Sequence, residues 1–195
     1  MNRLAIAAAF ALAGCQAPAS DSAPDPAARP PLEGARIGGP FTLVDQTGAE
    51  VTDRRFAGQY RIMYFGYTFC PDVCPTDMQT IGAAMRLLPP ATAAKITPIF
   101  VTVDPERDTP AVLKQFVSAF HPRMVGLTGS VQAIERVKKA YAIYSAKGDP
   151  APGGGYLVNH SRQVYLMDPA GKPIALLPQD QGPQPVADAI RQWVK

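Results

Sequence analysis

The sequence predicts a mixed α/β fold in which helices flank a central β-sheet. Two nearly continuous apolar runs, 61–67 and 96–103, are typical of strands buried on both faces of a sheet. Other segments repeat apolar residues at helical spacing and are separated by glycine and proline. The expected order of elements is β, β, α, β, α, β, α, β, β, α, and no internal repeat is visible. This order mixes hairpins with crossover helices, so we expect a mixed sheet.

The first elements predict an N-terminal hairpin and the centre of the sheet. Residues 41–44 are predicted as a strand, 45–48 as a turn, and 50–52 as the returning strand. The run 61–67 is the expected central strand because almost every residue in it is apolar. Further along, 125–127 is a short strand, and 163–167 and 174–177 form a hairpin around a turn at 168–171.

Four helices are predicted from apolar stripes. The first follows the second of two cysteines and stops at Pro89, while the second has Thr109 as its N-cap and Pro110 in its first turn. The third begins after Ser130 and extends toward Gly148, and the fourth lies near the C-terminus. Their apolar faces are Met78, Ile81, Met85 and Leu88; Val112, Leu113, Phe116, Val117 and Phe120; Val131, Ile134, Val137, Tyr141 and Tyr144; and Val186, Ile190 and Trp193.

The composition fits one globular domain with a tail. The chain has 195 residues, and its hydrophobic fraction of 47% is ample for a packed core. The formal net charge is +3 from 19 basic and 16 acidic residues, and no run of Lys or Arg could neutralise a row of phosphates. We therefore expect no nucleic-acid partner.

The N-terminal region predicts export and lipid anchoring. A short positive start precedes an apolar run, 4–13, that is too short to span a bilayer as a helix. Leu12-Ala13-Gly14-Cys15 resembles the bacterial lipoprotein box, in which the Cys receives a lipid before cleavage. We expect a signal peptide at 1–14, a lipidated flexible tether at 15–39 and a folded domain at 40–195. The domain would then lie in the periplasm of a bacterial cell envelope, on either membrane; an ordinary signal peptide with an incidental Cys15 is the alternative.

Cys70 and Cys74 are the candidates for chemistry. They lie four residues apart where the central strand leads into the first helix, with Pro75 expected to open that helix and Cys74 at or near its cap. Backbone N–H groups at a helix start favour negative charge, so we expect at least one thiol to ionise readily. Thiolates serve both disulfide exchange and soft-metal binding. The alternative is a structural disulfide or buried thiol pair, although so small a loop would contribute little chain entropy.

Motifs follow one another through the domain in a fixed order. Tyr-Phe-Gly-Tyr-Thr-Phe-Cys-Pro-Asp-Val-Cys-Pro occupies 64–75, and Asp-Pro-Glu-Arg-Asp-Thr-Pro occupies 104–110. Gly-Leu-Thr-Gly follows at 126–129, and His160-Ser161 precedes Tyr-Leu-Met-Asp-Pro at 165–169. Together they resemble the Sco/SenC family over essentially the whole domain. The resemblance implies a thioredoxin-like fold that binds copper and helps to build the binuclear copper centre of cytochrome c oxidase subunit II.

The same resemblance implies that Cys70, Cys74 and His160 hold one copper ion, as Cu(I) or Cu(II). The residue chemistry agrees, since Cu(I) is soft and accepts low coordination, whereas a structural zinc site requires four ligands. The implied partners are the oxidase subunit II copper site, a periplasmic copper donor and a thiol reductant, together with the membrane through the anchor. One departure is Asn159, where many relatives carry Asp, which puts in doubt how His160 is tuned.

Two functions of different class share these thiols. The protein is either a copper metallochaperone or an enzyme-like thiol-disulfide oxidoreductase in which Cys70 and Cys74 form a redox-active pair. Two features favour the copper metallochaperone. Dithiol exchange does not need His160, and three residues separate the cysteines, where common disulfide oxidoreductases have two. A peroxidase with Cys74 as its resolving thiol fits less well, because thioredoxin-like peroxidases use a different local motif.

Other residues are predicted around this site. We expect Asp104 and Asp108 near it at the end of a neighbouring strand, as groups that support ligands or as ordinary capping groups. His121 is predicted as a surface group at a helix end. The glycine- and proline-rich residues 148–155 are predicted as a mobile loop that lets His160 approach and leave the thiols, or as an ordinary exposed connection.

Overall fold

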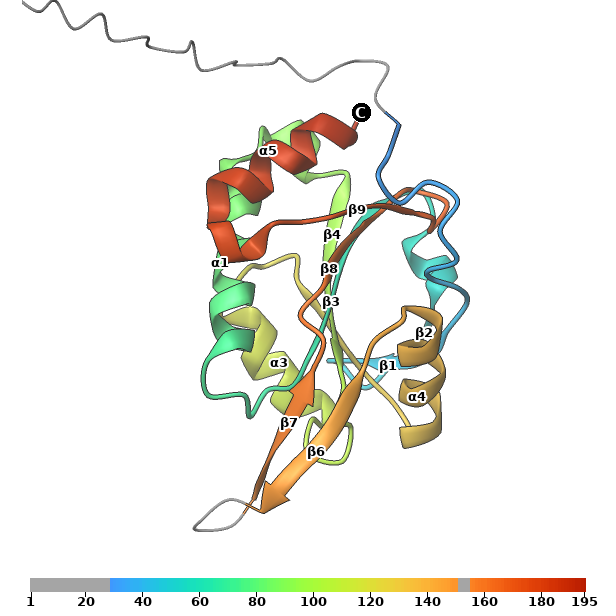
Figure 1. The fold of residues 1–195 in the computed structure, drawn as a ribbon, viewed down its shortest axis with the longest axis vertical. Coiled ribbons are helices and arrows are strands. Elements are labelled where there is room, and N and C mark those ends of the chain that lie inside the picture. Colours follow the sequence, from blue (N-terminus) through green and yellow to red (C-terminus); the bar gives the residue numbers. More distant parts are fainter. Residues whose placement is uncertain (1–28, 151–154) are drawn as a thin grey trace, which may run out of the picture.

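A computed structural model describes residues 29–150 and 155–195 of the chain. Seven strands form one central sheet in the order β2-β1-β5-β4-β3-β8-β9, and helices cover both of its faces (Figure 1). The strands are β1 (Thr42–Asp45), β2 (Glu50–Thr52), β3 (Tyr60–Gly66), β4 (Ile96–Thr102), β5 (Val125–Thr128), β8 (Val164–Met167) and β9 (Pro173–Leu176). This arrangement confirms the predicted mixed α/β fold.

The middle of the sheet is parallel and its margins are antiparallel. β3 pairs in parallel with β4, and β4 with β5. β8 runs antiparallel to β3, and β1 runs antiparallel to both β5 and β2, which confirms the predicted N-terminal hairpin. Every residue of β4 is buried, and so is all of β3 after its first residue, as a strand covered on both faces requires.

The helices divide between the two faces of the sheet. Figure 1 shows α1 (Val73–Leu87), α3 (Pro110–Ser118) and α5 (Pro183–Trp193) on one face and α4 (Val131–Ala140) on the other. The side chains of Thr109 and Ser130 accept hydrogen bonds from the backbone N–H groups of Val112 and Ala133, which confirms both predicted N-caps. Short helical turns complete the fold: η1 (Asp53–Phe56), α2 (Pro90–Ala93) and η2 (Gln179–Gln181). In the described parts of the chain, no helix is long and apolar enough to cross a membrane.

The third predicted helix is too long, and the hairpin that follows it was not predicted. α4 ends at Ala140, and Ala142 has φ 53°, a left-handed conformation that a helix cannot continue through. Tyr144, expected on the buried face, is 64% exposed. Strands β6 (Ser145–Pro150) and β7 (Tyr156–His160) then pair antiparallel as a separate two-stranded sheet. Residues 148–150 therefore belong to a strand rather than to the expected loop, and 151–154 lie outside the described residues.

The domain makes contacts N-terminal to the predicted boundary at residue 40. Leu32 and Ile37 pack against the core, and the backbone N–H groups of Leu32 and Gly38 donate to the carbonyls of Ile174 and Ala140. The part of the predicted tether from 30 to 39 thus contacts the domain. The predicted signal peptide, the lipidation site Cys15 and the rest of the tether lie outside the described residues.

Candidate metal centre

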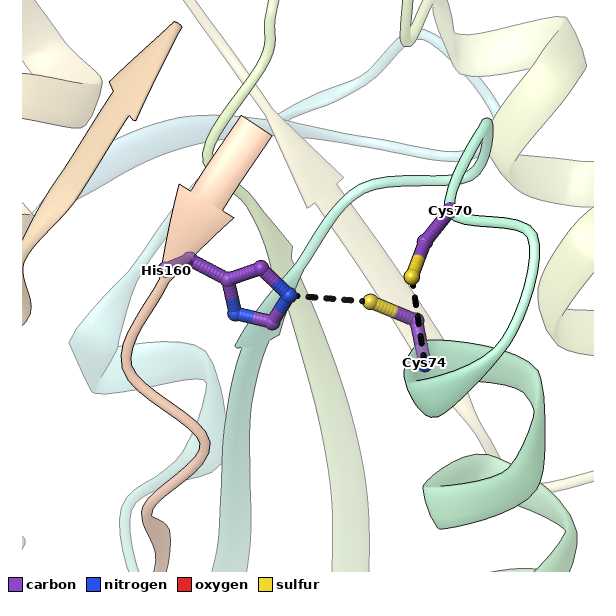
Figure 2. A group of neighbouring side chains, drawn as sticks. All are labelled: Cys70, Cys74 and His160. Carbon is purple, nitrogen blue, oxygen red and sulfur yellow. Dashed lines mark hydrogen bonds between the residues drawn. The ribbon is translucent and has the colours of Figure 1, made fainter. Parts of the chain in front are cut away.

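Cys70, Cys74 and His160 come from three different parts of the fold. Cys70 lies in the connection from β3 to α1, Cys74 lies in the first turn of α1, and His160 is the last residue of β7 (Figure 2). α1 begins at Val73 with Asp72 in the N-cap position, so the predicted helix start at Pro75 is two residues too late. The two cysteines follow the central strand, β3, as predicted.

The three donor atoms converge on one point. Sγ of Cys74 lies 3.2 Å from Nε2 of His160, and the backbone N–H of Cys74 donates to Sγ of Cys70 at 3.4 Å. All three donor atoms lie within 4.8 Å of one another. Figure 2 shows the imidazole and Cys70 on two sides of the Cys74 sulfur. Among residues 29–150 and 155–195, this is the one group of at least three His, Cys, Asp or Glu side chains that could hold a metal ion.

The tautomer of His160 is fixed by its neighbour. Nδ1 of His160 lies 2.9 Å from the carbonyl oxygen of Ser161, which can only accept, so Nδ1 carries the proton. The neutral ring then has its lone pair on Nε2, directed at the thiols. Burial is the main cause that lowers the pKa of His160, and it thereby favours the neutral ring. His160 is therefore preorganised as a ligand through Nε2.

Both cysteines are free thiols, and burial opposes the ionisation of Cys74. Cys74 is fully buried, and desolvation is the largest cause that raises the pKa of its thiol far above the ordinary value. The expectation was that at least one of the two thiols ionises readily; at Cys74 desolvation opposes this, because it outweighs the backbone N–H groups around the sulfur. With Nδ1 of His160 carrying the ring proton, the Cys74 S–H donates to Nε2 of His160. A cationic ligand would have to displace that proton.

Gly66 makes room for the Cys74 sulfur, and sequence reasoning did not identify it as a site residue. A Cβ atom on Gly66 would lie 2.8 Å from Sγ of Cys74 and 2.7 Å from the Tyr64 ring. The rings of Tyr64 and Tyr67 meet the His160 ring nearly at right angles, at centroid distances of 6.3 and 5.8 Å. The motif at 64–67 thus encloses the site, and the glycine within a buried strand was the signal that could have found it.

Asp108 holds the chain that leads into Cys70. Its buried carboxylate accepts hydrogen bonds from the backbone N–H and hydroxyl of Thr68 at 3.1 and 2.6 Å, and from the hydroxyl of Thr102 at 2.5 Å. Burial is the largest cause that raises the pKa of Asp108. Asp108 therefore supports the candidate site without belonging to the group of three side chains that could hold a metal, in agreement with one of its two expected roles.

Asp104 and Arg107 attach the β6–β7 hairpin to the rest of the domain. Asp104 accepts hydrogen bonds from the Tyr156 hydroxyl at 2.8 Å and from Nε of Arg107 at 2.5 Å. The Arg107 guanidinium lies 3.7 Å from the ring centroid of Tyr156 and 4.9 Å from that of Phe69, which precedes Cys70. Arg107, which was not predicted to have a role, therefore joins the Cys70 loop to the strand that carries His160.

Two other histidine-related expectations have clear outcomes. His121 does not belong to the candidate metal group of Cys70, Cys74 and His160. It is only 9% exposed, and its Nδ1 accepts a hydrogen bond from the backbone N–H of Arg123, so the predicted surface position is wrong. Asn159 is exposed and pairs with Ala146 on β6. Since successive strand residues point to opposite faces, Asn159 points away from the site that His160 faces. The partner of the His160 ring is the Ser161 carbonyl.

Sequence comparisons identify a family. The profile of the SCO1/SenC family matches residues 29–195. The chain is 45% identical over 159 residues to protein SenC of Rhodobacter capsulatus, covering 80% of this chain and 70% of SenC. It is 39% identical over 160 residues to mitochondrial SCO1 of Saccharomyces cerevisiae, covering 82% of this chain and 54% of SCO1. The chain thus spans about half the length of the yeast relative.

Structural comparisons agree. Bradyrhizobium japonicum ScoI with copper bound has a TM-score of 0.74 to this chain at 39% identity, covering 80% of this chain and 99% of ScoI. The thioredoxin domain of a thiol-disulfide oxidoreductase from Bacteroides vulgatus has a TM-score of 0.59 at 16% identity, covering 82% of this chain and 96% of that domain. The second likeness concerns the fold alone, and it confirms the thioredoxin-like prediction.

Proposed function

Because the chain belongs to the SCO1/SenC family, we propose that it is a copper metallochaperone that binds one copper ion through Cys70, Cys74 and His160. In this function it assists assembly of the binuclear copper centre of cytochrome c oxidase. The observation that carries the proposal is the convergence of three donor atoms within 4.8 Å, two of them sulfur. The copper held by the relative ScoI supports the choice of metal.

The donor set favours Cu(I) as the cargo. Two thiolates and one imidazole satisfy a soft ion of low coordination, whereas a closed zinc site takes four protein ligands. The described residues place no fourth Cys, His, Asp or Glu in this group. The neutral His160 presents its Nε2 lone pair, and Cys74 gives up its proton when the ion arrives. The ion is thus held by groups that small movements of the Cys70 loop and the β6–β7 hairpin would release.

The partners follow from the same proposal. The receiving site is the copper site of oxidase subunit II, and a periplasmic copper donor and a thiol reductant supply copper and electrons. Support for the location comes from the sequence Leu12-Ala13-Gly14-Cys15, which would anchor the domain to a bacterial membrane by a lipid on Cys15. The segment from Cys15 onward would then tether the domain at the periplasmic surface.

The function is tested by copper binding and by oxidation of the thiols. The reduced protein is expected to bind one Cu(I) per chain, more tightly than Zn(II), in competition with a chromophoric chelator. Oxidation of Cys70 and Cys74 to a disulfide should abolish tight binding, because a disulfide sulfur is a poor ligand. Oxidised protein that keeps its affinity, or reduced protein that binds two copper ions per chain, would contradict the proposal.

A second function is favoured by one observation. Cys70 is the more exposed cysteine of the pair, and its Sγ accepts a hydrogen bond from the backbone N–H of Cys74. A Cys70 thiolate could attack a disulfide of a partner, after which Cys74 would attack the mixed disulfide, leaving two partner thiols and a Cys70–Cys74 disulfide. A dithiol reductant would then restore the pair. In this function the protein would keep the cysteines of the oxidase copper site reduced.

His160 separates the two functions. His160→Ala should retain the reduction of a model disulfide at near wild-type rate but fail to supply the oxidase copper centre in cells grown at limiting copper. Cys70→Ser and Cys74→Ser should lose both activities. A normal copper centre in cells that carry His160→Ala would make the thiol-disulfide oxidoreductase the better account.

A further inference from the structure

A buried carboxylate lies behind the metal-binding group and joins three elements. Asp77 is on α1, three residues after Cys74, and is 1% exposed. Its Oδ1 accepts a hydrogen bond from Nη2 of Arg162 at 2.8 Å, and its Oδ2 accepts one from Nε of Arg162 at 3.2 Å. Oδ2 also accepts the hydroxyl proton of Tyr64, on β3, at 2.9 Å. The two-pronged contact fixes the guanidinium in orientation as well as in distance.

Arg162 lies two residues after His160, at the point where the chain leaves β7 for β8. Its own backbone is held as well, because Nε2 of Gln179 donates to the Arg162 carbonyl at 2.7 Å. The Tyr64 ring, tied to Asp77 by its hydroxyl, meets the edge of the His160 ring. The helix that carries Cys74 and the segment that carries His160 are therefore connected by a direct ion pair and by an aromatic contact.

We propose that Asp77 and Arg162 are positioning residues that lock the segment of His160 against the helix of Cys74, and so hold Nε2 where it can serve as the third copper donor. The inference rests on the proposed copper-binding function. Without the pair, the hairpin end could move while both thiols stayed in place. Neither residue contacts the metal-binding atoms through its own polar group; each acts through the backbone it holds.

The sign of the effect separates positioning from simple electrostatics. Arg162 is a cation near a site for a cation, so its removal would strengthen copper binding if charge alone mattered. If Arg162 positions His160, its removal weakens binding, and residues that orient metal ligands typically contribute about 10- to 100-fold in affinity. We therefore expect Arg162→Gln to weaken Cu(I) binding by about tenfold or more. Arg162→Lys, which keeps the charge but loses the two-pronged contact, should recover only part of that loss.

The test is a thermodynamic cycle in the full chain, with Cu(I) affinity measured by chelator competition. In a His160→Ala background, Arg162→Gln should change the affinity by less than about twofold, because the ligand it positions is already absent. Asp77→Asn combined with Arg162→Gln avoids a buried unpaired carboxylate and should weaken binding as much as Arg162→Gln alone. Asp188→Asn is the control; it removes a carboxylate–arginine pair on the exposed face of α5 and should change nothing.

A second readout needs no metal. Nitrogen-15 NMR of the metal-free protein should show His160 held as the Nδ1-protonated tautomer in the wild type, and averaged between tautomers in the double variant Asp77→Asn, Arg162→Gln. Affinity unchanged or increased in Arg162→Gln, or lowered equally in the His160→Ala background, would overturn the positioning role. A wild-type protein that binds no copper would instead overturn the proposed function, and the NMR comparison would still decide whether the pair orders the ring.

Discussion

At the scale of single residues, the site depends on how little space surrounds Cys74. The thiol is fully buried, touches Nε2 of His160 on one side and lies against Gly66 on another. Its environment favours the protonated thiol in the metal-free protein, so a metal ion and a proton compete for the same sulfur. Both the packing and the protonation of Cys74 lead to measurable expectations.

Gly66→Ala tests the packing. A Cβ at 2.8 Å from Sγ of Cys74 cannot be accommodated without movement, so we expect a loss of about 1–3 kcal/mol in the free energy of unfolding together with weaker Cu(I) binding. Gly126→Ala is the matched control, because its Cβ would meet Val117 at 3.1 Å in the core away from the site. The control should lose stability in urea denaturation but keep its copper affinity. Equal effects of both variants on copper would argue against a special role for Gly66.

The raised pKa of Cys74 predicts a dependence of stability on pH in the metal-free protein. Folding favours the protonated thiol, so this stabilisation is fully present below the ordinary thiol pKa of 9.0 and decreases as the pH rises above it. Wild-type protein should lose up to about 1.4 kcal/mol of unfolding free energy per pH unit in that range relative to Cys74→Ala. The measurement is urea denaturation between pH 8 and 10 with a reductant; parallel curves for the two proteins would contradict it.

At the scale of elements, the β6–β7 hairpin brings the third donor to the cysteines. His160 ends β7, and Tyr156 at the other end of that strand is held by Arg107 through ring stacking and through a hydrogen bond of 2.9 Å from Nη1 to the Tyr156 carbonyl. The hairpin forms a two-stranded sheet that is separate from the central sheet. Contacts of side chains at both ends of β7 attach it to the rest of the domain. Its position relative to the thiols is therefore set by a few identifiable contacts.

Arg107→Ala is expected to loosen this hairpin without unfolding the domain. Losing the stacked guanidinium and its hydrogen bonds should lower the protection of the β7 amides in hydrogen exchange by about tenfold, equivalent to about 1.4 kcal/mol. Lys114→Ala, on the exposed side of α3, is the control and should leave these amides unchanged. Unaltered protection of 156–160 in Arg107→Ala would show that other contacts hold the strand.

The elements also show what the sequence could predict. The buried runs of β3 and β4 and the capped helices α3 and α4 follow from local patterns, and their caps were located to the residue. The β6–β7 hairpin could not be found in this way, because Ser-Ala-Lys-Gly-Asp-Pro has no alternating apolar pattern and gains its structure by pairing with β7. For the site, the motifs of the sequence indicate Cys70, Cys74 and His160. The Asp77–Arg162 ion pair could not be predicted from a local sequence pattern, because its residues are 85 positions apart.

At the scale of the whole molecule, a compact domain is proposed to work at the end of a lipidated tether. The family profile begins at residue 29, and the described contacts with the core begin at Leu32. The site lies at the carboxyl end of the central strand, where loops from several elements meet. A tethered domain would present this site to membrane-bound partners at high effective concentration.

Cys15→Ser tests the anchor. The lipoprotein box requires the thiol of Cys15, so the variant should remain an unlipidated precursor, while its domain folds and binds copper as the wild type does. Mass spectrometry of the membrane fraction provides the measurement. A wild-type mature chain with an unmodified N-terminus at another residue would rule out the lipid anchor but leave the copper site untouched.

The central claim is that two cysteines and one histidine hold a single copper ion, and X-ray absorption spectroscopy of the reduced, Cu(I)-loaded protein tests it most directly. The wild type should show two sulfur neighbours and one nitrogen neighbour for one copper per chain, and His160→Ala should lose the nitrogen while keeping both sulfurs. A copper environment of sulfur alone in the wild type, or one that is unchanged in His160→Ala, would contradict the assignment of His160 and with it the proposed site.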